Sequence, residues 1–271
     1  MKFSTCWPSF CASPLALALA LILGAPLAAL AQSLTPDTVL LGAGVRSRPA
    51  YDGSASQRED LIPVVRYYGK PWFARTTQGL LEGGARLELA PGLNAGAQLA
   101  YEAGRLTSES DLLRNRDVPD INPGASFGLH VEWDTKLGPA PVGVLARGRQ
   151  HMDSDRGTRA DLRLTVGIYG DERVLAGVFV QGTWANAKSG QSFYGVTQQQ
   201  SAATGLAAFD AQSGPLFASI GLLGSIELGR EWLAVGSVEG RRLQGDAARS
   251  PLAERTSNFY LSVGLAYRFR T

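Results

Sequence analysis

The sequence predicts an all-β fold: an antiparallel transmembrane β-barrel of about twelve strands, with short periplasmic turns and long outer loops. Three observations lead to this prediction. Apolar and polar residues alternate along many segments, most of them about nine to thirteen residues long, as tilted strands that cross a bilayer require. The connections between these segments alternate between short and long. The last segment carries an apolar face with aromatic residues at both ends.

That last segment shows the pattern most clearly. From Phe259 to Phe269 every second residue is apolar or aromatic, and the intervening residues are mostly small or polar. Such a period of two is the signature of a strand with one apolar face. An apolar band flanked by aromatics is typical of a lipid-facing barrel strand. A sandwich strand could show the same alternation, so the rest of the chain decides.

The first 31 residues have the features of a secretory signal peptide. Lys2 is their only charge, residues 15–23 form a short apolar core, and residues 29–31 (Ala-Leu-Ala) supply a cleavage site before Gln32. The apolar run is too short to span a bilayer comfortably, which disfavours a membrane anchor. We therefore predict a signal peptide over residues 1–31 and a barrel domain over residues 32–271.

Composition excludes several classes of function. Cys6 and Cys11 both lie in the predicted signal peptide, so the exported chain has no cysteine for a disulfide, a thiolate nucleophile or a metal site. The formal net charge is +2, and removal of Lys2 leaves +1, which argues against nucleic acid as a partner. An exported chain of this kind is a periplasmic β-sandwich or an outer-membrane barrel.

The predicted strands are longer than the roughly five or six residues that are usual in soluble sandwiches. Their ranges are 38–46, 60–68, 71–77, 80–89, 93–102, 123–134, 139–150, 158–169, 174–184, 215–227, 231–243 and 257–269.

The connections divide into two sets, which favours a barrel over a sandwich. One set is short and rich in Gly, Pro and Asp, as turns are; it comprises 68–71, 90–92, 137–139, 170–173 and 229–230. The other set is mostly long and polar; it comprises 47–59, 103–122, 151–157, 185–214 and 244–256. The connection 77–79 belongs to the second set by position but is short. Because the number of strands is even, the first strand begins and the last strand ends on the short-turn side.

Alternation also predicts which charged residues point into the lumen. A charge on the lipid face would cost about 2–4 kcal/mol near the midplane, so charges should segregate inward. Two interpretations follow: the charges pair and fill the lumen, which their mixed signs favour, or they line a narrow solute channel or porin-like pore. The predicted lumen-facing polar network consists of Arg86, Glu88, His130, Glu132, Arg147, Arg149, Asp161, Arg163, Glu239 and Arg241.

Catalysis is not expected. His151 with Asp153, Ser154 and Asp155 could form a hydrolase site at the outer rim, but the same residues suit a solvated turn, which we favour. Asp153 and Asp155 alternate as in part of a calcium loop, without its further ligands. We expect His130 to be a lumen hydrogen-bond partner. No phosphate loop, zinc spacing or nucleophile elbow is present, so we predict no enzyme activity, cofactor or metal.

The loop 185–214 contains exposed aromatics that can mark a contact site or pack the loop onto the barrel. We expect residues 193–196 to extend the strand or to fold back over the mouth, and residues 197–214 to form a short helix or to remain mobile.

Several segments resemble the MipA/OmpV family of outer-membrane proteins, named after the MltA-interacting protein. They are the opening region 42–69 with its Pro-x-Tyr-x-Gly-Ser loop, the element 193–196, the Gly-Asp-Ala-x-x-Ser-Pro run at 245–251, and the closing strand 264–269. The resemblance implies a non-enzymatic outer-membrane scaffold that brings a murein transglycosylase and a murein synthase together, with outer-membrane lipid as a further partner. It also implies possible use of the outer loops in adhesion or envelope stress.

Overall fold

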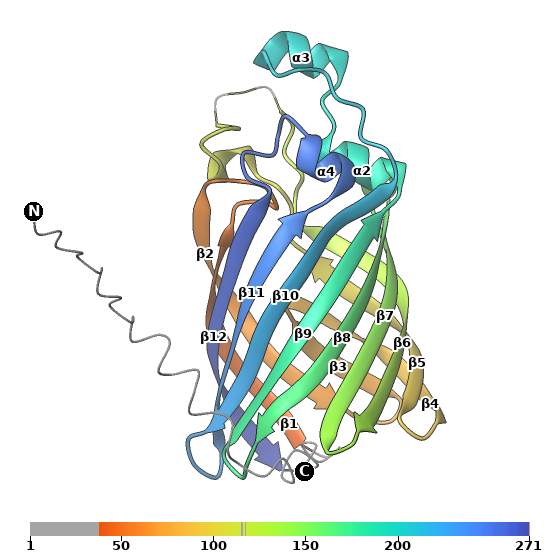
Figure 1. The fold of residues 1–271 in the computed structure, drawn as a ribbon, viewed down its shortest axis with the longest axis vertical. Helices are drawn as coiled ribbons and strands as arrows, with labels where there is room; N and C mark the ends of the chain where they lie inside the picture. The colour runs from red at the N-terminus through yellow and green to blue at the C-terminus, as the bar shows by residue number, and fades with distance from the viewer. Residues whose placement is uncertain (1–37, 115, 117, 271) are drawn as a thin grey trace, which may run out of the picture.

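The computed structural model describes residues 38–114, 116 and 118–270, and these form a closed barrel of twelve antiparallel strands (Figure 1). Each strand pairs with its neighbours in sequence, and β1 closes the barrel against β12 from Thr38↔Arg270 to Ser47↔Leu261. The predicted signal peptide lies outside the described residues. The strands are β1 (Thr38–Pro49), β2 (Gln57–Tyr68), β3 (Trp72–Thr77), β4 (Leu80–Ala90), β5 (Leu93–Glu102), β6 (Gly124–Leu137), β7 (Ala140–His151), β8 (Thr158–Gly170), β9 (Val174–Ala185), β10 (Gly214–Glu227), β11 (Trp232–Leu243) and β12 (Ser257–Arg270).

All twelve predicted strands are present, and the fold class is confirmed. The main differences are at strand ends: β1 continues to Pro49, β2 begins at Gln57, and β6 runs on to Leu137. These additions are polar or turn-like residues that the alternation of apolar residues could not assign, because they extend the ladder beyond the apolar band.

The two rims differ as the connection lengths predict. Short turns join β2 to β3, β4 to β5, β6 to β7, β8 to β9 and β10 to β11, at the rim where Thr38 and Arg270 pair. The opposite rim carries the long loops and the helices of the described residues, of which Figure 1 labels α2, α3 and α4 at one end of the barrel. The helices are η2 (Thr107–Glu109), η3 (Ser154–Arg156), α2 (Ala187–Tyr194), α3 (Gln198–Thr204) and α4 (Gly245–Arg249). None of the helices in the described ranges is long and apolar enough to cross a membrane.

Residues 193–196 of the loop between β9 and β10 were expected either to extend the strand or to fold back over the mouth, and they do not extend the strand. Residues 193–194 end helix α2 instead of extending the strand, and Val196 pairs with Phe209 in an isolated bridge. The segment therefore folds back over the barrel mouth. The expected short helix is α3, which is preceded by a capping box. The Thr197 hydroxyl accepts a hydrogen bond from the Gln200 backbone amide, and the Gln200 side-chain oxygen accepts one from the Thr197 backbone amide.

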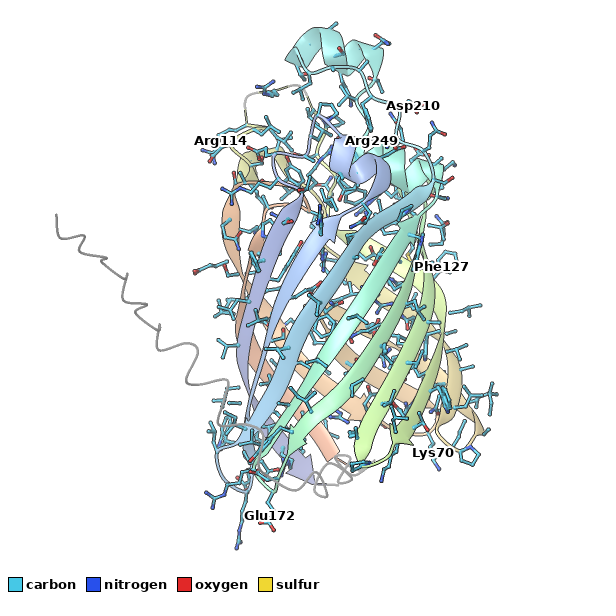
Figure 2. All side chains as sticks on the ribbon, in the orientation of Figure 1. Lys70, Arg114, Phe127, Glu172, Asp210 and Arg249 are labelled. Atoms are coloured by element: carbon cyan, nitrogen blue, oxygen red, sulfur yellow. The ribbon has the colours of Figure 1, made fainter. Side chains whose placement is uncertain are left out.

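The distribution of side chains is the inverse of that in a soluble protein. Leu61 and Leu129 on the outer face are 86% and 70% exposed, whereas Glu82 on the inner face is 1% exposed. Phe127, which belongs to this outer face, projects away from the wall in Figure 2. Exposed aromatics lie near both ends of the strands: Tyr101, Phe127, Trp184 and Phe259 toward the long loops, and Trp72, Trp133, Trp232 and Phe269 toward the short turns. An apolar belt between aromatic girdles is suited to a lipid bilayer.

The β2–β3 ladder is the shortest in the described wall. β3 is only six residues long and pairs with β2 solely at Arg66, Tyr67 and Tyr68. Pro63 of β2 has no amide hydrogen to continue the ladder, and its carbonyl accepts a bond from the Thr76 hydroxyl at 2.8 Å instead. Residues 57–62 of β2 therefore have a strand partner on one side only, β1. The β3–β4 hairpin is thereby free to leave the wall.

Two lipid-facing residues of β8 can be used to test how deeply each part of the strand lies in the membrane. Leu164 lies at the middle of the strand and points outward, whereas Ala160 points outward near the long-loop end. We expect Leu164→Arg to lower the free energy of unfolding in phospholipid bilayers by about 2–4 kcal/mol, and Ala160→Arg by about 0–1 kcal/mol. Guanidinium titration of the refolded protein measures both. Equal losses at the two positions would contradict the predicted membrane depth.

Candidate functional site: the charged lumen and its lid

The middle of the lumen is filled by a network of ion pairs. Glu82 of β4 accepts hydrogen bonds from Arg75 Nε at 2.5 Å and from Arg147 Nη1 at 2.6 Å. Gln98 Nε2 donates to its second oxygen at 2.9 Å. Arg147 continues the network, because its Nε also donates to Asp161 at 3.0 Å. Two arginines, Arg75 and Arg147, therefore compensate the charge of the buried Glu82 carboxylate.

Asp161 of β8 carries the network to the next strands. It accepts bonds from Arg149 Nη2 at 2.9 Å and from the Thr183 hydroxyl at 2.7 Å. Arg149 Nη1 in turn donates to Glu102 at 3.0 Å. The chain of contacts thus spans β5, β7, β8 and β9 in addition to β3 and β4. All these side chains except Glu102 are buried.

Other members of the predicted network lie beside this chain of contacts. Glu132 of β6 accepts a bond from Arg75 and lies 3.6 Å from Arg86 Nη1. Arg163 of β8 stacks on the ring of Phe179, with its guanidinium carbon 3.9 Å from the ring centre. Among the described residues, no carboxylate lies within 4 Å of Arg163.

His130 and Glu88 occupy different surroundings. His130 is 2% exposed and meets the ring of Phe73 edge-on at 5.1 Å. Neither of its ring nitrogens has a hydrogen-bond partner within the described part of the chain. Glu88 is exposed near the short-turn rim and accepts only a long bond, 3.4 Å, from the Gly92 amide. The structure therefore places His130 in an apolar contact and Glu88 apart from the ion pairs.

A second group of charges lies nearer the long loops. Arg241 of β11 donates to Glu239 at 2.9 Å and to Asp52 of the β1–β2 loop at 2.9 Å. The hydroxyl of Tyr260 also donates to Asp52. Burial by itself would raise the pKa of Asp52, but the charge of Arg241 and the Tyr260 hydroxyl outweigh it and lower that pKa. Asp52 therefore stays ionised and ties the loop to the barrel wall.

The β3–β4 hairpin turns into the lumen and reaches this second group. Gln78, the only residue other than glycine with a positive φ in the described chain (53°), donates from Nε2 to Glu239 at 2.9 Å. Gly79 packs against Arg46 of β1, so closely that an added Cβ would lie 2.6 Å from Nη1. The hairpin thus crosses part of the lumen to β1 and β11, which explains why the connection 77–79 is short.

A lid of packed loops covers the long-loop end. One apolar cluster joins α2, the start of β10 and α4; its buried members are Ala185, Tyr194, Ala211, Leu216, Phe217, Leu243 and Ala247. A second joins the β1–β2 loop, the β5–β6 loop and the segments after α2 and α4; its buried members are Ala50, Tyr51, Leu113, Val118, Val196 and Leu252. Because the clusters draw on four loops, the lid is a small hydrophobic core of its own.

Hydrogen bonds pin the lid loops to one another. The Tyr51 hydroxyl donates to the Leu252 carbonyl at 2.7 Å, and the Ser250 hydroxyl donates to the Tyr194 carbonyl at 2.6 Å. Burial raises the pKa of Tyr51 to about 12, so the phenol keeps its proton and remains a donor. Arg105 donates to the Phe193 carbonyl at 2.6 Å. Each bond joins two different loops, which makes the lid cooperative.

The candidate hydrolase residues do not form a catalytic set. His151 Nδ1 accepts a hydrogen bond from the backbone amide of Asp153 at 3.0 Å. The Asp153 carboxylate accepts from the Asp155 amide at 3.1 Å and caps the short helix η3. The acidic groups therefore serve the turn, as the preferred interpretation of this loop predicts. Within the described ranges, no group of three or more His, Cys, Asp or Glu side chains is placed to hold a metal ion.

Sequence reasoning missed two important residues, Gln78 and Asp52. The unusually short connection 77–79 could have drawn attention to Gln78, because a short link on a rim of long loops indicates a special structural role. Asp52 lies in the Pro-x-Tyr-x-Gly-Ser loop, and nothing in its spacing indicates that it would meet Arg241, which is 189 residues further along the chain.

A closed twelve-stranded barrel with an apolar outer belt and a charged lumen defines an outer-membrane β-barrel protein. A sequence model of the MltA-interacting protein MipA matches residues 41–269, most of the chain. The chain therefore belongs to the MipA family, and the expected family is confirmed.

Solved structures with a similar fold are only distantly related in sequence. An outer-membrane channel from Pseudomonas putida F1 has 11% identity and a TM-score of 0.49, with 91% of this chain and 97% of that chain covered. The translocator domain of the autotransporter NalP from Neisseria meningitidis has 11% identity and a TM-score of 0.43, with 86% and 88% covered. OmpT of Vibrio cholerae has 8% identity and a TM-score of 0.39, with 86% and 96% covered. No curated protein matches the chain.

The central network gives a prediction with a matched control on the same strand. Glu82→Gln removes the carboxylate that compensates Arg75 and Arg147, and we expect it to lower the free energy of unfolding by about 3–5 kcal/mol. Glu88→Gln makes the same chemical change at an exposed position and should alter it by less than about 0.5 kcal/mol. Denaturant titration in bilayers compares the two. Similar small effects would mean that the Glu82 ion pairs are not the core of the lumen.

Proposed function

We propose that this protein is a closed, non-enzymatic outer-membrane scaffold or interaction protein linked to murein assembly. The observation that carries the proposal is the obstruction of the lumen at three levels: the Glu82 and Asp161 ion pairs, the hairpin tip at Gln78, and the lid. A barrel filled in this way has little room for a solute path. Its remaining surfaces are the lipid-facing belt and the two rims.

The absence of a catalytic arrangement supports the non-enzymatic part of the proposal. Of the two histidines, His130 touches Phe73 rather than a carboxylate, and His151 receives a backbone amide. General acid–base catalysis requires such a group within hydrogen-bond reach of a partner that orients or activates it. The proposal therefore assigns the protein's role to binding.

The family name supports a murein enzyme as the partner class, since it describes an MltA-interacting protein. We propose a murein transglycosylase and a murein synthase as partners, held at the short-turn rim that faces the periplasm. This rim is narrow, but it carries exposed charges, of which Figure 2 labels Lys70 and Glu172. Further exposed charges there are Lys136, Arg173, Arg230 and Glu231. Charges on short, rigid turns suit electrostatic selection of a partner.

Closure of the lumen predicts electrical silence. The refolded full-length protein should show no steady conductance steps in a planar bilayer, because the buried ion pairs and the lid exclude a continuous water column. Heat-modifiable migration on gels would establish that the silent protein is folded. Regular ohmic steps from folded protein would contradict the proposal and favour the narrow-channel interpretation.

The scaffold role predicts that periplasmic rim charges control partner binding. Reversing Lys70 and Glu172 together (Lys70→Glu, Glu172→Lys) keeps the net charge, and we expect at least a several-fold loss of co-purification with a periplasmic murein transglycosylase. Arg249→Glu is the control, since Arg249 lies on the opposite rim with a side chain 71% exposed. Unchanged co-purification by the rim variant, or loss by the control, would place the partner elsewhere.

A further inference from the structure

A small cavity lies beneath the lid, where five elements of the chain converge. Its volume is about 10 Å³. It lies between the end of β5, the end of β7, η3, the start of β8 and α2. Its lining includes Glu102, Arg149, His151, Arg156, Arg159 and Phe193. None of the functions discussed above uses this place.

The lining of the cavity has an excess of positive charge. Its single carboxylate, Glu102, is paired with Arg149 at 3.0 Å. Arg156 and Arg159 have no carboxylate within 4 Å among the described residues. Their oxygen partners are neutral: Arg156 donates to the Asn122 carbonyl at 2.6 Å, and Arg159 donates to the Ser189 hydroxyl at 3.0 Å. Neither guanidinium is therefore held in an ion pair, and the lining carries three arginines against one carboxylate.

Three buried nitrogen donors in this lining have no partner. They are Arg149 Nε, Arg156 Nε and His151 Nε2, on side chains of residues that are 7%, 7% and 8% exposed. His151 Nδ1 accepts a bond from the Asp153 amide, so the proton of a neutral ring must be on Nε2. All three nitrogens are thus donors. Leaving buried donors unsatisfied costs free energy, so acceptors are expected beside them.

Gly124 of β6 allows two of these side chains to approach its backbone closely. A Cβ added to Gly124 of β6 would lie 2.9 Å from His151 Nε2 and 3.3 Å from Arg156 Nη1. The imidazole edge and the guanidinium therefore approach the same point. Phe193 contacts both arginines. Its ring centre is 4.1 Å from the guanidinium carbon of Arg159 and 5.7 Å from that of Arg156.

Size and charge together define the ligand. A cavity of roughly 10–15 Å³ holds about one water-sized particle. A water molecule would satisfy the donors but would leave the excess positive charge at Arg156 and Arg159. A small anion meets both needs, and the burial of charge without compensation is costly. We infer that this cavity is a binding site for a small monovalent inorganic anion such as chloride.

The position of the site indicates what the anion does. Arg149 and His151 belong to the barrel wall, whereas Arg156 belongs to η3 in the β7–β8 loop. The Arg156 guanidinium also donates to the Asn122 carbonyl of the β5–β6 loop and lies over the ring of Phe193 in the lid helix α2. An ion that accepts bonds from Arg156 and from the wall residues therefore links the lid to the wall through Arg156. A ligand that binds only the folded arrangement raises its stability in proportion to the logarithm of its concentration above the dissociation constant.

The test is the stability of the full-length refolded protein in sodium chloride and in sodium gluconate at equal ionic strength. We expect the midpoint of heat-modifiable unfolding to rise with chloride concentration and to saturate, and not to rise with gluconate, which is too large for the cavity. Equal midpoints in the two salts would overturn the inference and leave a bound water as the occupant.

Two variants separate the site from general salt effects. Arg156→Gln removes one of the two guanidinium charges that are not held in an ion pair and should abolish the difference between chloride and gluconate. Arg249→Gln is the matched control, an exposed lid arginine that faces another surface, and should keep the difference. Loss of the difference in both variants would overturn the site assignment.

A direct measurement does not depend on any variant folding. Crystals of the unaltered protein grown in sodium bromide should show an anomalous scattering peak between His151 Nε2 and Arg156. Bromide found only at exposed surface positions would mean that the cavity holds water and that the inference is wrong.

Discussion

The structure depends on one constraint: backbone amides and carbonyls inside a bilayer have no water to bond to. Only a helix or a closed sheet satisfies all of them internally. Here β1 meets β12 and completes the ladder. Once the sheet is closed, each strand must place alternate residues in lipid and in the lumen. Leu164 and Asp161 of β8 therefore face opposite environments although only two residues separate them in the chain.

The same constraint explains the crowded lumen. Charges excluded from the lipid face collect inside, where few waters remain to solvate them. A buried carboxylate is tolerated when cations and hydrogen-bond donors surround it, as Glu82 and Asp161 are surrounded. The pairing that makes these charges tolerable also occupies the middle of the lumen. The proposed closure of the lumen would thus be a consequence of where the charges are forced to lie.

Three of the four segments that carry the family resemblance contribute to the outer mouth. Tyr51 comes from the opening loop, Tyr194 and Val196 from the element after β9, and Leu252 from the run after β11. They contribute to two adjoining apolar clusters of the lid. The lid is therefore the most distinctive part of this barrel. The proposed murein partners would bind at the other rim. The lid would therefore have a separate role, in the proposed closure of the lumen. The inferred anion would add a link between the lid and the wall.

The sequence by itself determined the number of strands, the two rims and the inward or outward direction of most side chains, because strand periodicity is a local property with a period of two. It also placed Arg147, Arg149 and Asp161 on inward positions. Their partners depend on which strands become neighbours across the lumen, which periodicity does not encode. Only the tertiary structure decided that the hairpin tip at Gln78 leaves the wall for Glu239, that Asp52 meets Arg241, and that four loops form one core. These contacts join residues far apart in the chain, and their energies depend on burial that exists only after the barrel has closed.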